Sequence, residues 1–208
     1  VSPDIHVDIC VVPPSEERDY YTLVTMGMGA HRMNVPEELA EYKLERAELA
    51  IALPPDWKLD EESLKDERWY WPIGLLKVLA RLPISNDTWL GFGHTMDKQS
   101  PFAEDTELCA ALLVGPQDVV WNGGEVCTLP GGEEVNFYQV IPLYRDELEY
   151  KLAHDADALL GKMNGISFVV EPDRQDAITH GTLSNDDFDG EMDDASYHLE
   201  SIEEKELP

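Results

Sequence analysis

Alternating apolar and polar residues predict three strands in the first quarter of the chain. Residues 5–12 alternate and then become wholly apolar, residues 20–25 form a β-branched run, and residues 46–53 place four apolar side chains on one face. A short charged turn separates the first two runs, so we expect them to pair as a hairpin. Pro13-Pro14 ends the first strand and Pro54-Pro55 ends the third, because proline lacks the N–H that a sheet needs.

A different spacing, of three and four residues, predicts a long helix after residue 71. Pro72 suits its first turn, and Pro83 is expected to end it. The apolar stripe of this helix consists of Ile73, Leu76, Leu79 and Ala80. A shorter helix is expected where Pro36 leads an acidic turn at residues 37–39. The tryptophans around the long helix are expected to lie in the core, since large aromatic side chains bury much apolar area.

The rest of the chain predicts four more strands and a second long helix. The strands are expected over residues 108–114, 126–129, 135–141 and 166–170, between glycine and proline turn signals. The helix is expected over residues 146–163, with Gly165 as its stop. These elements predict an α+β fold, in which a mixed β-sheet is packed by two main helices within a single domain over residues 1–178.

Residues 179–208 differ in composition from the rest of the chain. Aspartate and glutamate dominate, and apolar residues are few. The like charges repel, and the segment cannot bury enough apolar surface to offset the loss of backbone entropy. We therefore expect an acidic C-terminal tail that is extended or disordered.

The charge of the whole chain excludes several classes of partner. Forty-three acidic residues stand against fifteen lysines and arginines, which gives a net charge of −28. Such a chain repels nucleic acid and anionic membrane surfaces, and it attracts a basic protein. High solubility is an equal explanation of the same charge. Three cysteines without a Cys-x-x-Cys motif, and no apolar run long enough to cross a bilayer, predict a reducing cytoplasm.

A glycine-containing loop follows the second predicted strand. Gly27 and Gly29 can take backbone angles that a side chain forbids, and methionines surround them. The loop lacks the third glycine and the Gly-Lys-Ser/Thr sequence of a phosphate-binding loop, so we expect no nucleotide cofactor. It can instead approach the protein's own core or a partner. Our hypothesis is a protein-binding surface at Met28, His31, Arg32 and Met33.

An alternative hypothesis is a metal-dependent hydrolase. His6 and Asp8 share one face of a predicted strand, and His31 and His94 could complete a mixed nitrogen and oxygen site. However, no tight His-x-x-x-His spacing supports a metal, and no Gly-x-Ser-x-Gly motif supports a nucleophile. We favour the simpler explanation, in which Asp8 anchors neighbouring backbone and His6 lies at the surface. We therefore predict no metal and no catalytic residue.

Several motifs together resemble the suppressor of fused family, in the compact form of its bacterial members. They run from the first residues to about Ile178: His6-Val7-Asp8-Ile9, Pro13-Pro14, Leu23-Val24-Thr25-Met26-Gly27-Met28, Arg46-Ala47-Glu48-Leu49, Leu53-Pro54-Pro55-Asp56-Trp57, Trp71-Pro72-Ile73, Leu75-Leu76-Lys77-Val78-Leu79-Ala80-Arg81, Gly93-His94-Thr95 and Ile141-Pro142-Leu143-Tyr144. Gly29 stands where we expect a serine in this family. Family members also carry a helical segment before the first strand, so we expect that the beginning of the domain is missing.

The resemblance implies a protein-binding function and brings no catalytic signature. The animal namesake clamps a peptide of a transcription factor by adding strands to its sheet, and bacterial relatives are suspected immunity proteins or antitoxins. Our prediction is a non-catalytic binding module, either an antitoxin against a basic toxin or a regulatory binder of a peptide. A third hypothesis is a regulatory subunit whose acidic tail shields its own binding groove.

Overall fold

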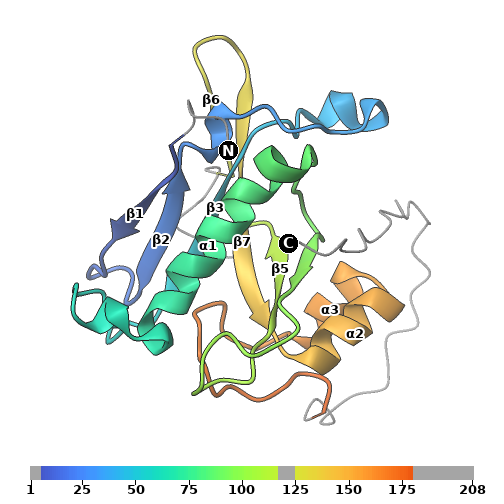
Figure 1. The fold of residues 1–208 in the computed structure, drawn as a ribbon. Coiled ribbons are helices and arrows are strands. Elements are labelled where there is room, and N and C mark those ends of the chain that lie inside the picture. Colours follow the sequence, from blue (N-terminus) through green and yellow to red (C-terminus); the bar gives the residue numbers. More distant parts are fainter. Residues whose placement is uncertain (1–5, 117–124, 180–208) are drawn as a thin grey trace.

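A mixed seven-stranded sheet forms the centre of the molecule (Figure 1). The structure is a computed structural model, and it describes residues 6–116 and 125–179. The strand order is β1-β2-β3-β7-β5-β4, with β6 also paired to β7, and only the β3–β7 pair is parallel. The strands are β1 (Asp8–Val12), β2 (Tyr21–Met26), β3 (Ala47–Leu53), β4 (Thr95–Asp97), β5 (Ala110–Val114), β6 (Val126–Thr128) and β7 (Glu134–Leu143).

The predicted hairpin of β1 and β2 is confirmed, with Cys10 opposite Val24 at its centre. The alternation of residues 46–53 indicates a strand with one buried face, whereas all seven residues of β3 are buried, so both of its faces are covered. Residues 166–170 are not a strand, contrary to the prediction. They form only a bridge, in which Val170 N–H donates to the Ala52 carbonyl oxygen. The short strand β4 has no clear alternation, and sequence reasoning missed it.

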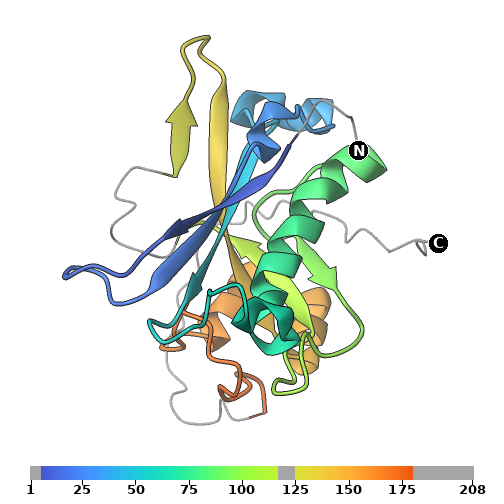
Figure 2. The same cartoon turned by 60° about the vertical axis from the view of Figure 1, so that its left-hand side comes forward.

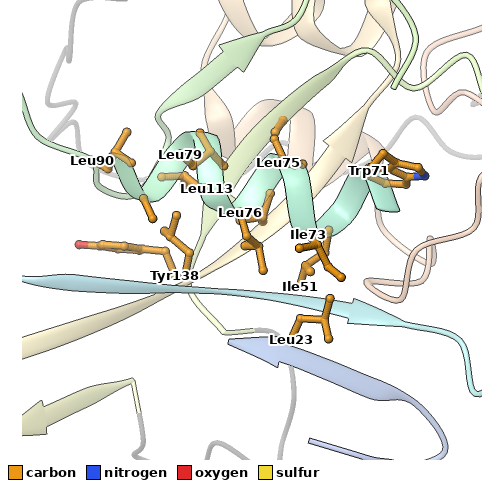
Figure 3. Close-up of a cluster of buried hydrophobic side chains, with 14 of the residues drawn as sticks. Leu23, Ile51, Trp71, Ile73, Leu75, Leu76, Leu79, Leu90, Leu113 and Tyr138 are labelled. Atoms are coloured by element: carbon orange, nitrogen blue, oxygen red, sulfur yellow. The ribbon is translucent and has the colours of Figure 1, made fainter. Parts of the chain in front are cut away.

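The helix α1 (Glu67–Asn86) covers one face of the sheet (Figure 2). Figure 3 shows its apolar side chains above Leu23, Ile51 and Tyr138 of the strands. The helix begins earlier than predicted, because Asp66 caps it by accepting a hydrogen bond from the Arg68 N–H at 3.0 Å. Pro83 does not end the helix as predicted. It lies in the last turn, where a missing N–H costs one hydrogen bond at most.

Two short helices replace the predicted helix of residues 146–163. They are α2 (Arg145–Ala153) and α3 (Ala156–Lys162), and the chain breaks between them because Asp155 starts a new helix by accepting from the Ala158 N–H at 2.7 Å. Both cover the opposite face from α1. Leu112 and Leu143 point into a core with them, whereas Leu113 and Val140 point toward α1.

Three 3-10 helices complete the described chain: η1 (Met28–Ala30), η2 (Glu37–Tyr42) and η3 (Ser63–Lys65). The predicted helix after Pro36 is η2, although it is a 3-10 helix. None of the described helices is long and apolar enough to cross a membrane. The sheet and its helices confirm a single α+β domain. The acidic tail lies beyond Thr179, outside the described residues, and its predicted boundary stays a prediction.

A buried ion pair fastens the last described residues to α2. Glu147 is fully buried, and the guanidinium of Arg174 donates to both of its carboxylate oxygens at 2.5 Å. The N–H groups of Tyr144 and Ala177 donate to the same carboxylate at 2.9 Å. The charge of Glu147 is therefore fully satisfied inside the core.

Candidate protein-binding site

The loop predicted to bind a partner, Gly27–Met33, is held by a buried carboxylate. Glu48 of β3 is 9% exposed, and its Oε1 accepts hydrogen bonds from the Gly27 and Gly29 N–H groups at 2.9 Å. Its Oε2 accepts from the Thr25 hydroxyl at 2.5 Å. Three donors from the end of β2 and the loop thus converge on one side chain. The loop is fixed to the sheet by this carboxylate.

The loop geometry requires a glycine at position 27 and leaves little room for a side chain at position 29. Gly27 has φ 112°, and a Cβ there would lie 2.1 Å from the carbonyl oxygen of His6. A Cβ at Gly29 would lie 3.0 Å from the Val135 side chain and 3.3 Å from the Glu48 carboxylate. Only glycine lets the backbone at position 27 approach the His6 carbonyl group this closely. At position 29 a side chain would fit only tightly against Val135 and Glu48.

A cation holds the other side of the same loop. Arg46, just before β3, donates from Nη1 to the carbonyl oxygens of Gly29 and Ala30, both at 2.9 Å. Its Nε and Nη2 donate to Glu133 Oε1 at 3.1 and 2.8 Å. The N–H groups of the loop thus face Glu48, and two of its carbonyl groups face Arg46. Neither residue was predicted to have a role; the one signal in the sequence is an isolated acid within the apolar run of β3.

The four residues predicted at the binding surface have different surroundings. Met28 and Met33 are 2% and 3% exposed and belong to the core beneath α1, so their side chains offer no contact surface. They are buried because η1 turns the loop inward onto β3. His31 is half-buried, and Arg32 is exposed and donates to Glu45 at 2.9 Å. Binding of a partner by this loop stays a prediction. Of the four predicted residues, His31 and Arg32 are the two whose side chains reach the surface.

An exposed methionine next to the loop was not predicted. Met26 ends β2 and is 57% exposed, opposite Asp8 of β1. Val11 of β1 is 45% exposed. Strand β1 pairs only with β2 among the described residues, so its outer backbone groups have no strand partner. The loop, Met26 and this strand edge form one continuous corner of the molecule, because Gly27 contacts the backbone of His6.

The residues of the alternative metal site do not converge. His6 Nε2 and Asp8 Oδ1 lie 2.8 Å apart at the surface, and the described residues contain no group of three histidines, cysteines or acids that could hold a metal. His94 packs against the Trp89 ring, with a centroid distance of 4.3 Å. Burial lowers the pKa of His94 to about 4, with a further contribution from Lys151. The described geometry does not support the alternative hypothesis of a hydrolase site.

The three cysteines differ in burial. Cys10 is half-buried, Cys109 is buried and Cys127 is exposed, and all three are free. Burial raises the pKa of the Cys109 thiol, which disfavours the nucleophilic thiolate. Cys10 lies within β1, and Cys109 lies directly before β5.

Comparison with known proteins identifies the family. The family model described as Suppressor of fused protein (SUFU) matches residues 3–175. No curated protein matches the chain. Among solved structures, Drosophila Suppressor of Fused has a TM-score of 0.56 and 20% identity, over 83% of this chain and 43% of that chain. The chain thus spans less than half of that relative.

Two further structures have the same fold. The Sufu-Fu complex structure matches with a TM-score of 0.56 and 18% identity, over 83% of this chain and 77% of that chain. A SUFU homologue from Neisseria gonorrhoeae matches with a TM-score of 0.53 and 16% identity, over 84% of this chain and 80% of that chain. Since the family model covers most of the chain, the resemblance seen in the sequence is confirmed, and the chain belongs to the suppressor of fused family.

Proposed function

We propose that this chain is a non-catalytic protein-binding module. A relative with the same fold has been crystallised as a Sufu-Fu complex. The observation that carries the proposal is the corner where the open edge of β1 meets exposed Met26 and the fastened loop Gly27–Met33. An open strand edge can pair with a polypeptide, and a rigid loop loses little conformational entropy when a partner binds.

Exposed acidic residues that follow the loop in the chain indicate the chemistry of the partner. Glu37, Glu38 and Glu41 of η2 are exposed and form no ion pair with any described residue. The helix η2 begins at Glu37, four residues after Met33, and lies near the top of the molecule in Figures 1 and 2. With a net charge of −28, this surface attracts a basic protein and raises its association rate. A basic toxin is such a partner, and the role is then that of an immunity protein or antitoxin; a basic regulatory peptide is another.

The experiment begins with capture of a partner on the purified chain from its host lysate, followed by binding measurements with the purified partner. We expect Met26→Glu to lower the affinity at least tenfold, because it places a charge in an apolar contact. The matched control is Leu152→Glu on α2, where an equally exposed leucine lies away from the corner. Equal affinities for both variants would contradict the proposed surface.

The charge of the partner is tested by association kinetics. The triple variant E37K/E38K/E41K should lower the association rate constant about tenfold at ~0.15 M salt, with a smaller change in the dissociation rate. The control variant E16K/E17K/D19K reverses three exposed acids at the β1–β2 turn, the opposite end of the hairpin from the loop. If both triple variants change the rate equally, the acids of η2 have no special part in binding.

A further inference from the structure

A groove lined by two positively charged side chains lies at the β1 edge of the sheet, the edge that also belongs to the proposed binding corner. Its volume is about 340 Å³, and β1 and α1 line it together. The apolar members are Val7, Ile9 and Ile73, and the polar members are His6, Asp8, Lys77 and Arg81. One wall is the open strand edge and the other carries two cations. We refer to this feature as the edge groove.

Arg81 is exceptional among the arginines of the chain. Each of the other six donates a hydrogen bond to a described residue, and five of them pair with a carboxylate. Arg81 forms no hydrogen bond or ion pair with any described residue, although the chain has 43 acids. Lys77, one helical turn earlier, lies 3.3 Å from the Tyr70 hydroxyl and has no carboxylate partner among the described residues. Asp8 is the groove's own acid, and it is paired with His6 at 2.8 Å.

The two cations have a spacing that matches an extended chain. Lys77 and Arg81 are four residues apart on α1, which corresponds to about 6 Å along the helix. Side chains two residues apart on one face of a strand are separated by about 6.6 Å. A strand that pairs with the outer edge of β1 could therefore direct two alternate carboxylates at the two cations. Its other side chains could contact the apolar floor of the groove.

We infer that the edge groove binds an extended acidic segment of a partner protein, with carboxylates at alternate positions, which adds to β1 as a further strand. The inference rests on the proposed binding function and adds a second, oppositely charged contact to it. Backbone hydrogen bonds to β1 supply sequence-independent affinity, and Lys77 and Arg81 select the acidic pattern. The partner is thus a protein with a basic surface and one acidic strand.

Labelled heptapeptides test the inference without the natural partner. The peptide TVETEVT places two glutamates on one face, TVETEVT with both glutamates replaced by lysine reverses the charge, and the isomer TVEETVT places the glutamates on opposite faces. By fluorescence anisotropy at ~0.15 M salt, we expect the first peptide to bind at least tenfold more tightly than the second. It should also bind more tightly than the isomer, because only alternate carboxylates reach both cations.

Substitutions at Lys77 and Arg81 test whether the charge of the groove determines which peptide binds. K77E/R81E should reverse the preference, so that the lysine peptide binds better than the glutamate peptide, and R81Q alone should weaken glutamate-peptide binding several-fold. The control K162E reverses an exposed cation of α3 and should leave both affinities within twofold. Circular dichroism of each variant checks the fold. Equal binding of both charged peptides, or no effect of the groove variants, would overturn the inference.

Failure of this inference and failure of the proposed function have different signatures. If the peptides do not bind but M26E still weakens a captured partner, the edge groove is wrong and the module remains a protein binder. The opposite result is that the glutamate peptide binds through Lys77 and Arg81, while M26E and L152E bind the captured partner with equal affinity. In that case the edge groove is confirmed and the proposed corner surface is wrong.

Discussion

The two buried carboxylates of this domain hold chain segments by different chemistry. Glu48 accepts only from uncharged donors, the Thr25 hydroxyl and the Gly27 and Gly29 N–H groups. Glu147 faces the guanidinium of Arg174 in a two-point pair, with further N–H donors. The first arrangement fixes a loop beside the surface, and the second fixes the end of the described chain over α2. Removing a donor from Glu48 leaves other donors in place, whereas removing Arg174 leaves a buried charge without its counterion.

The largest loss of stability is expected at the buried Glu147–Arg174 ion pair. Arg174→Met should lower the free energy of unfolding by about 3–5 kcal/mol, because it leaves the buried carboxyl of Glu147 without its counterion. Urea denaturation measures the loss. The double variant E147L/R174M should lose clearly less, since it removes both charges. A double variant as unstable as R174M would mean that packing dominates the effect.

The second-largest loss of stability is expected at Gly27, where the chain enters the loop. Gly27→Ala should cost about 2–3 kcal/mol of unfolding free energy, because φ 112° and a clash with the His6 carbonyl both oppose a Cβ. Gly131→Ala is the matched control, since a Cβ at that position meets no atom within 4 Å. Equal stabilities would show that the loop can move away from β1.

Glu48, whose hydrogen-bond donors are all uncharged, should respond more moderately. Glu48→Gln keeps the shape of the side chain but turns one acceptor into a donor, so we expect a loss of about 2 kcal/mol. Hydrogen exchange should accelerate at the Gly27 and Gly29 amides and stay unchanged at Ala177, whose amide bonds to Glu147. Faster exchange at both places would mean that the two sites are one cooperative unit.

Besides the two carboxylates, the buried side chain of His94 should make the free energy of unfolding depend on pH. His94 has a folded pKa of about 4 because it is buried, against 6.5 in an unfolded chain. The unfolded state therefore binds more protons between these values, and stability should fall by about 2–3 kcal/mol as the pH drops from 6.5 to 4. The variant H94Q should flatten this part of the stability curve. An unchanged slope in H94Q would assign the loss to the acidic groups instead.

The sequence predicts most of the fold because its strands and helices have clear apolar periods. The β1–β2 hairpin, β3, β5, β7 and α1 follow from those periods. The errors lie where a single polar contact decides the local structure. Asp66 starts α1 before Pro72, and Asp155 divides the second long helix into two. Neither capping contact has a periodic signature.

The candidate site could be predicted only as a position along the chain. Gly27 and Gly29 indicate a constrained loop, but the methionines around them could equally line a groove or fill the core. The structure places Met28 and Met33 in the core. The residues that hold the loop, Arg46 and Glu48, come from a neighbouring strand and have no short-range spacing to Gly29. The edge groove likewise needs α1 to be placed beside β1.

Hydrogen-exchange mass spectrometry of the chain with its purified partner shows which surface the partner covers. Exchange should slow in β1 and in residues 26–33 when the partner is bound, and in residues 73–81 as well if its acidic strand fills the edge groove. Protection confined to α2 and α3, with the exchange of β1 and the loop unchanged, would contradict the proposed binding surface.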